Sequence, residues 1–119
     1  MTTIPLIEPA KGVTEETIRR LLRPSMRVLR DDDLGPLFRR ALSHRWDEHL
    51  AIMVDFWSSI ALRTRRYGGK PQVAHRGMAL LERQFERWLA LFEATAREVC
   101  EPDAAEFFID RAHRIADCL

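Results

Sequence analysis

Residues 45–63 read RWDEHLAIMVDFWSSIALR, and this stretch decides the fold class. Large apolar side chains recur along it every three or four positions, which is the period of one face of an α-helix. They are Trp46, Leu50, Met53, Trp57 and Ile60. His49 and Phe56 belong to an adjoining face on the same side. The stretch therefore predicts one long amphipathic helix that carries a histidine among large apolar neighbours.

The chain before this helix predicts a shorter, interrupted helical segment. Thr14 is a favourable helix cap, and helical spacing continues from it to Pro24. Because proline lacks an amide donor and disfavours helix at the residue before it, the helix should kink or split there. Asp31-Asp32-Asp33 predicts a solvated stop and cap. Gly35-Pro36 is a turn signal, so the next segment is expected to hold one short helical turn around Phe38.

The chain after this helix predicts a break and two more helices. Residues 65–71 include two adjacent glycines and a proline, which is typical of a loop. Residues 71–78 are expected to form a helix of two turns at most, which carries His75. Apolar residues at helical spacing then predict helices over about 80–99 and from Pro102 to the C-terminus. No strand alternation is visible, so the fold class is all-α.

The composition of the chain limits the classes of function that it can have. Residues 1–13 have no periodicity and predict a flexible N-terminal arm, followed by one domain at 14–119. The 19 basic and 18 acidic residues give a net charge of +1, which argues against a nucleic-acid partner. No signal peptide or membrane span is visible, and Cys100 and Cys118 cannot frame a disulfide scaffold. These features predict a cytoplasmic protein.

Two of the four histidines are candidates for chemistry. His49 has large apolar neighbours, so it needs a partner or stays neutral. His75 lies on a short element between two long helices, from which it could face the opposite helix as an axial metal ligand. Zinc-site spacing, glycine-rich phosphate loops and nucleophile motifs are absent from the sequence. Arg63, Arg65 and Arg66 are either a solvated helix end or a site for an acidic group.

An ordered set of motifs from Asp33 to Ala116, about 84 of 119 residues, resembles the group III truncated haemoglobins. The motifs are DLGPLF (33–38), WDEHL (46–50), FWSSIAL (56–62), YGGKP with AHRGM (67–71, 74–78), QFERWLALFEAT (84–95) and RAHRIA (111–116). The resemblance implies a globin-like two-over-two helical sandwich around a haem pocket.

The resemblance also implies roles for individual residues. His75 matches the proximal histidine that binds the haem iron, and Phe38 the phenylalanine that packs on the haem. His49 matches a distal histidine and could act as a sixth iron ligand, with Met53 bounding the ligand site. Trp88 matches the distal tryptophan whose ring N–H can donate a hydrogen bond to the ligand. Two further residues are expected at the haem: Trp57 and Tyr67.

The sequence departs from the family on the distal side. The family usually has a Phe-Tyr pair where this chain has Pro24 and Ser25. The short side chain of Ser25 would need a bridging water to reach a ligand, so distal hydrogen bonding falls on His49 and Trp88. A basic residue that often follows the distal histidine is replaced by Ile52. The candidates left for pairing with the haem propionates are Arg63, Arg65, Arg66, Lys70 and Arg76.

The resemblance implies a haem b protein that binds the diatomic ligands O2, NO or CO. Three modes of action stay open. The first is redox turnover of O2, NO or peroxide, a dioxygenase- or peroxidase-like reaction with a reductase as partner. The others are simple binding or sensing of the ligand, and a six-coordinate iron with His49 as the sixth ligand. A monomer or weak dimer is expected. The rival hypothesis is a haem-free helical interaction module that keeps the globin fold. Pro24, Ser25 and Ile52 favour this rival, whereas His75, Phe38 and Trp88 oppose it.

Overall fold

The computed structural model describes residues 12–42, 45–70, 75 and 80–118, and only the backbone of residues 24–26 and 29. Within these ranges the chain is helical and contains no strand, which confirms the all-α prediction. The elements, in chain order, are α1 (Glu15–Ser25), the 3₁₀ helix η2 (Met26–Arg30), α2 (Leu34–Leu42), α3 (Trp46–Ala61), α5 (Glu82–Val99) and α6 (Pro102–Asp117).

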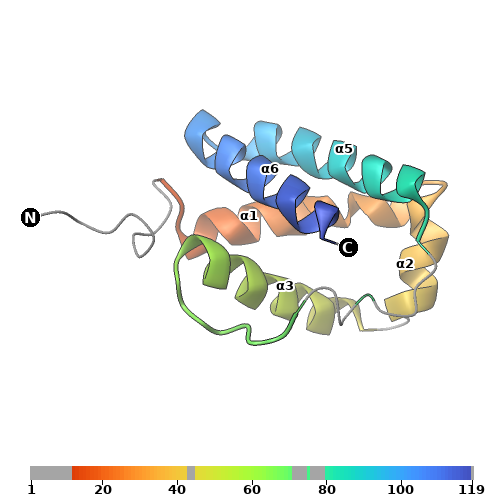
Figure 1. Cartoon of the computed structure of the whole chain (residues 1–119), viewed down its shortest axis with the longest axis horizontal. Coiled ribbons are helices and arrows are strands. Elements are labelled where there is room, and N and C mark those ends of the chain that lie inside the picture. Colours follow the sequence, from red (N-terminus) through yellow and green to blue (C-terminus); the bar gives the residue numbers. More distant parts are fainter. Residues whose placement is uncertain (1–11, 43–44, 71–74, 76–79, 119) are drawn as a thin grey trace, which may run out of the picture.

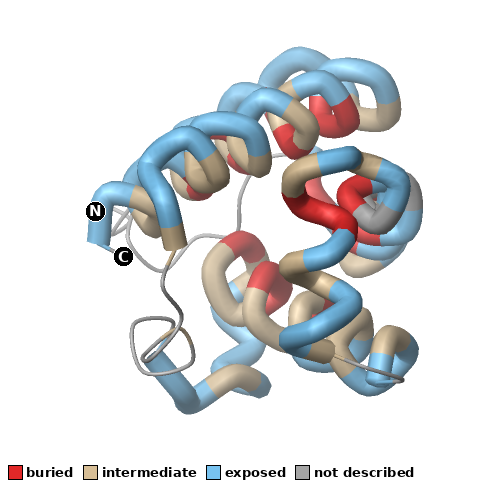
Figure 2. Tube along the Cα trace, turned by 90° about the vertical axis from the view of Figure 1, so that its right-hand side faces the viewer, coloured by how far each residue is buried: buried red, intermediate tan, exposed pale blue. Residues whose placement is uncertain are grey.

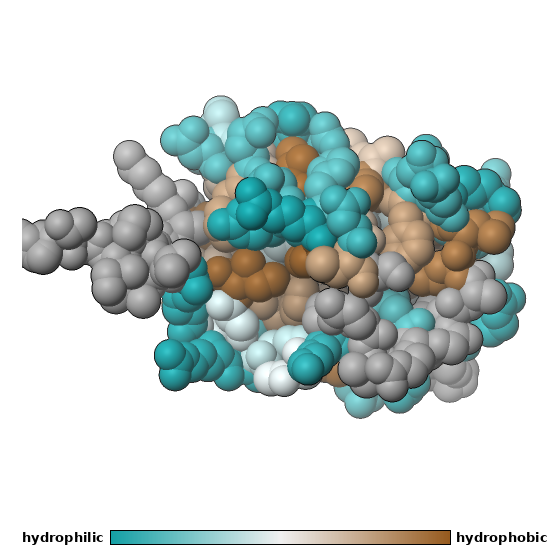
Figure 3. Space-filling view, in the orientation of Figure 1, coloured by the Kyte–Doolittle hydropathy of each residue, from teal (hydrophilic) through white to brown (hydrophobic). Residues whose placement is uncertain are grey.

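The helices form two antiparallel pairs (Figure 1). Helix α5 packs against α6, and α1 packs against α3. Contacts between α1 and α5 join the two pairs, and α2 crosses one end of the molecule. Buried residues lie on the helix faces that point inward, while the outward faces are exposed (Figure 2). The outer surface of α6 is largely hydrophilic (Figure 3). This is the two-over-two helical sandwich that the family resemblance implies.

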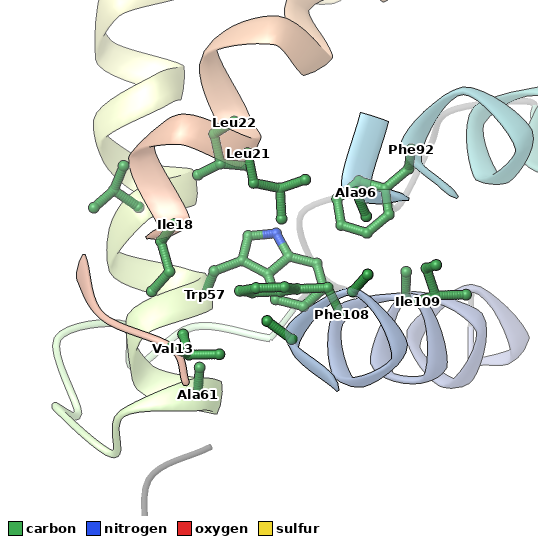
Figure 4. Close-up of a cluster of buried hydrophobic side chains, with 14 residues drawn as sticks. Val13, Ile18, Leu21, Leu22, Trp57, Ala61, Phe92, Ala96, Phe108 and Ile109 are labelled. Atoms are coloured by element: carbon green, nitrogen blue, oxygen red, sulfur yellow. The ribbon is translucent and has the colours of Figure 1, made fainter. Parts of the chain in front are cut away.

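The core lies where the two pairs meet (Figure 4). Ile18 and Leu21 of α1 and Phe108 of α6 have no solvent exposure, and Trp57 of α3 is buried among them. The ring centroids of Trp57 and Phe108 are 5.5 Å apart in an edge-on contact. Burying an aromatic side chain of this kind contributes about 1.5–3 kcal/mol. Trp57 thus ties α3 to the α5–α6 pair.

Helix α1 begins with the predicted cap. The Thr14 hydroxyl accepts a hydrogen bond from the Thr17 backbone N–H at 3.2 Å, and the Thr17 hydroxyl accepts one from the Thr14 N–H at 3.1 Å. The two residues form a reciprocal capping box. At its other end the helix runs through Pro24 to Ser25 and tightens to 3₁₀ geometry at Met26. The predicted split is therefore present, but two residues later than expected.

Helix α2 differs from the sequence prediction in length. It spans nine residues rather than one short turn around Phe38. Gly35 and Pro36 fall in its first turn, where a missing proline N–H breaks no intrahelical hydrogen bond. The expectation that Asp31–Asp33 is solvated was also wrong for Asp31, whose side chain is only 6% exposed. Asp31 accepts hydrogen bonds from the backbone N–H groups that begin the helix, so the predicted capping role is confirmed.

The segment after α3 folds back along that helix. The Ser58 and Thr64 hydroxyl oxygens are 2.8 Å apart, and the Tyr67 backbone N–H donates to the Ser59 hydroxyl at 2.9 Å. Arg66 forms an ion pair with Glu15 at the start of α1. These contacts lead the chain back along α3 before the segment that carries His75.

The remaining helix boundaries lie close to the predicted ones. The helix predicted over 45–63 spans Trp46–Ala61, and the one predicted over 80–99 spans Glu82–Val99. Among the described residues, no helix is both long and apolar enough to span a membrane. Val13, at the end of the predicted N-terminal arm, is buried against the core, whereas residues 1–11 lie outside the described residues. The two-turn helix predicted over 71–78 falls, except for His75, outside them as well.

Candidate functional site

A pocket opens between α1 with η2, α2, α3 and α5. The space between its side chains, including the open mouth, measures about 490 Å³. Its lining consists of Leu22, Val28, Phe38, Trp46, His49, Leu50, Met53, Trp57, Trp88 and Phe92. Nine of these ten side chains are apolar or aromatic, and His49 is the exception. The pocket is thus an apolar space with one ionisable group, a pattern typical of small-molecule and cofactor sites.

Helix α3 supplies half of the lining because its sequence has two adjoining apolar faces. Trp46, Leu50, Met53 and Trp57 come from one of these faces. His49, one residue before Leu50, joins from the other. The amphipathic pattern that predicts the helix therefore also predicts which of its side chains meet the pocket.

A stack of aromatic rings forms the wall between α3 and α5. The ring centroids of Trp88 and Phe92 are 5.1 Å apart with an interplanar angle of 19°. Phe92 stacks in turn on Trp57 at 5.4 Å and 17°. Offset stacking at these separations is favourable and fixes the ring orientations. The indole ring of Trp88 is thereby held at the pocket surface, where it is half-buried.

Phe38 and Trp46 form a second aromatic group at the α2 side of the pocket. Their ring centroids are 6.2 Å apart and nearly parallel, at 22°. The Trp46 ring then meets the His49 ring edge-on at 6.1 Å. These three side chains are all half-buried. Large apolar side chains that stay half-exposed around a pocket leave surface for an apolar ligand to cover.

The surroundings of the His49 imidazole favour its neutral form. Burial lowers its pKa below the ordinary value, and the nearby charge of His75 lowers it further. Within the described part of the chain, the His49 side chain makes no hydrogen bond. The His49 ring lines the pocket.

His75 lies close enough to His49 for their charges to interact, although 26 residues separate them in sequence. The His75 side chain is half-buried. The fold thus brings together the two histidines that the sequence singles out. Both imidazoles are nitrogen ligands of the kind that haem iron takes, and the aromatic lining suits a flat macrocycle, so the residues present fit a haem.

Two other predicted site residues lie elsewhere or cannot be placed. Tyr67 does not line the pocket; its ring packs edge-on against Phe56, with centroids 5.1 Å apart. Ser25 is the last residue of α1, and its side chain lies outside the described part of the structure.

The basic residues that could pair with the haem propionates have different surroundings. Arg66 pairs with Glu15 and Asp55. Arg63 and Arg65, both at a φ of 62°, are exposed, as is Lys70, and Arg76 lies outside the described residues.

Sequence reasoning missed five residues of the lining as site residues. They are Leu22, Val28, Trp46, Leu50 and Phe92. Trp46 and Leu50 belong to the stripe of α3 that already includes Met53 and Trp57, so the helical period was a usable signal. Phe92 is one turn after Trp88, and its position in the sequence is equally consistent with a core residue and with a site residue. Leu22 and Val28 meet the pocket through tertiary packing that no local spacing encodes.

Two antiparallel helix pairs, with an apolar pocket that His49 lines and a second histidine, His75, within electrostatic range of it, define a two-over-two globin. No family model matches the chain. The group 3 truncated haemoglobin of Campylobacter jejuni is 31% identical over 109 residues, which are 87% of this chain and 86% of that protein. A crystal structure of the group III truncated haemoglobin from Campylobacter jejuni superposes with a TM-score of 0.82 at 30% identity, over 92% of this chain and 90% of the other.

The chain therefore belongs to the group 3 truncated haemoglobins. This family implies a haem cofactor. The resemblance found in the sequence motifs is thus confirmed by comparison of both the whole sequence and the fold.

Proposed function

We propose that the chain binds haem b in the pocket described above, where His75 would be an iron ligand and His49 and Trp88 would lie beside the diatomic ligand. One observation carries this proposal: the His49 imidazole, whose pKa is lowered by burial and which has no hydrogen bond among the described residues, lines an aromatic pocket within electrostatic range of a second imidazole. A purely structural core would gain nothing from His49 at this place, because burying an imidazole without a hydrogen-bond partner is unfavourable.

Each residue has a physical task in this proposal. The His75 imidazole would bind iron through one ring nitrogen. Phe38 and Trp57 would pack against the macrocycle, and Met53 would bound the space for the ligand. The ring N–H groups of His49 and Trp88 would donate hydrogen bonds toward partial negative charge on the ligand. Haem iron supplies reversible binding of O2, NO or CO and one-electron chemistry.

Redox turnover is a finer proposal within the same site. A dioxygenase- or peroxidase-like reaction would need electrons from a reductase. Alternatively, His49 would coordinate the iron itself, because the short side chain of Ser25 does not compete for the space that a tyrosine fills in the family. A ferric spectrum that stays high-spin at neutral pH would contradict coordination by His49.

Absorption spectroscopy tests the proposal. The full chain is purified with haem supplied, and spectra are recorded in the ferric, ferrous and carbon monoxide forms. We expect a Soret band in all three forms and a clear shift when carbon monoxide is added. A chain that elutes folded and without haem would contradict the proposal and favour the haem-free interaction module.

A further inference from the structure

A single carboxylate connects two of the elements that carry the pocket. Asp31 Oδ2 accepts hydrogen bonds from the backbone N–H groups of Leu34 at 2.9 Å and Asp33 at 3.1 Å. Asp31 Oδ1 accepts a third, at 2.7 Å, from Nε of Arg87. The first two bonds hold the start of α2, and the third holds α5. Asp31 and Arg87 are 56 residues apart in sequence.

Both elements present an aromatic side chain to the pocket immediately beyond these bonds. Phe38 lies one turn after Leu34 on α2, and Trp88 directly follows Arg87 on α5. Both rings line the pocket. A change in the Asp31–Arg87 contact would therefore alter the position of α2 relative to α5, and with it the position of Phe38 relative to Trp88.

A neighbouring ion pair also joins this segment to α5 but is more exposed. Arg83 pairs with Asp33 through side chains that are 66% and 36% exposed. Such exposed pairs contribute little, because water screens them. Asp31, at 6% exposure, is shielded and accepts three hydrogen bonds, one of them charge-assisted and short. The Leu34 N–H and then Arg87 hold the pKa of the Asp31 carboxyl below its usual range, in keeping with a carboxylate that stays charged.

We propose that Asp31 and Arg87 are positioning residues of the ligand pocket, which fix the placement of Trp88 and hence the direction of its indole N–H. This inference deepens the proposed function and rests on it for its effect on the ligand. The placement of Trp88 itself can be measured in the chain whether or not haem is bound.

The primary test is the Arg87→Gln variant, with carbon monoxide as the probe. Arg87 is itself half exposed, so the substitution leaves the core and both Asp31 capping bonds in place. We expect the infrared C–O stretching band to move toward its position in Trp88→Phe, because a misplaced indole N–H no longer acts on the ligand. Arg83→Gln, the matched control one turn earlier on α5, should leave the band unchanged. Arg87→Lys, which keeps the cation, should restore most of the wild-type position.

A double-variant comparison separates positioning from general destabilisation. In a Trp88→Phe background, Arg87→Gln should have no further effect on the band, because the residue through which it acts is gone. Asp31→Asn, which keeps one acceptor oxygen for the cap, should reproduce Arg87→Gln. A wild-type band in Arg87→Gln, or equal shifts with and without Trp88, would overturn the inference.

A second readout keeps the inference testable if the chain binds no haem. Absence of a carbon monoxide band in the wild type would count against the proposed function. In that case the indole N–H resonance of Trp88, assigned with Trp88→Phe, decides the matter by NMR of the chain as purified. Movement of this resonance in Arg87→Gln but not in Arg83→Gln supports the positioning role, and no movement in either rejects it.

Discussion

At the scale of single residues, Trp88 and Asp31 carry the most specific parts of the proposed site. The Trp88 ring is fixed by stacking on Phe92 and lies at the pocket surface, where its N–H group is the part that a phenylalanine lacks. Asp31 is shielded from water and holds backbone and side-chain donors at once. The two residues therefore differ in what a substitution would report: a change at Trp88 reports ligand contact, whereas a change at Asp31 reports stability as well as the placement of Trp88.

Replacing Trp88 with phenylalanine should speed ligand dissociation. The substitution keeps an aromatic ring for the stack but removes one hydrogen-bond donor, whose net value is about 0.5–1.5 kcal/mol, so we expect a rate increase of about two- to tenfold. Stopped-flow measurement of oxygen dissociation from the haem-loaded chain checks this. Arg83→Gln, on the same helix but outside the pocket lining, is the control. An unchanged rate in Trp88→Phe would remove Trp88 from the ligand-binding role.

The Asp31 carboxylate should make the free energy of unfolding depend on pH in a defined range. Its folded-state pKa lies below the unfolded value of about 3.9, because the Leu34 N–H and Arg87 favour the charged form. Its contribution to stability is therefore complete above about pH 4 and is lost as the pH falls through the folded-state pKa. In urea unfolding from pH 7 to pH 3, the stability difference between wild type and Asp31→Asn should be constant above pH 4 and shrink below it. A difference that stays constant to pH 3, or one matched by Asp32→Asn at the exposed neighbour, would contradict this account.

At the scale of elements, local sequence decides where helices begin, and tertiary context decides how far they extend. The Thr14–Thr17 box starts α1, as the sequence indicates. Pro24 does not end α1 where its own chemistry suggests, since the helix continues to Ser25 before it changes type. In α2 the Gly35-Pro36 pair, which reads as a turn, occupies a first helical turn that Asp31 caps.

Removing the α1 cap should destabilise the whole fold, because α1 packs against both α3 and α5. Thr14→Ala deletes the hydroxyl that accepts the Thr17 N–H, and we expect a loss of about 1 kcal/mol in the free energy of unfolding. Thr14→Ser keeps the acceptor and should remain near wild type. Urea denaturation of the two variants makes the comparison; equal losses in both would show that the hydroxyl is not what matters.

At the scale of the whole molecule, the sequence predicts the helices and their buried faces better than it predicts the residues that line the pocket. Helical periodicity is enough to predict α3, α5 and α6, because each buries one continuous apolar face. His49 could be singled out because a histidine in such a face requires an explanation. Contacts such as Asp31 with Arg87, or Phe92 between Trp57 and Trp88, depend on how helices distant in sequence pack together. Spacing within one helix carries no information about these contacts.

The most direct test of the central claim, that His75 holds a haem iron in this pocket, is haem retention by His75→Ala. Haem-loaded wild type, His75→Ala and the control His113→Ala, whose side chain is exposed, are passed through gel filtration, and the Soret absorbance per chain is measured. We predict that wild type and His113→Ala keep their haem and that His75→Ala loses it, with recovery when free imidazole is added. A His75→Ala chain that retains haem with an unchanged spectrum would contradict the account.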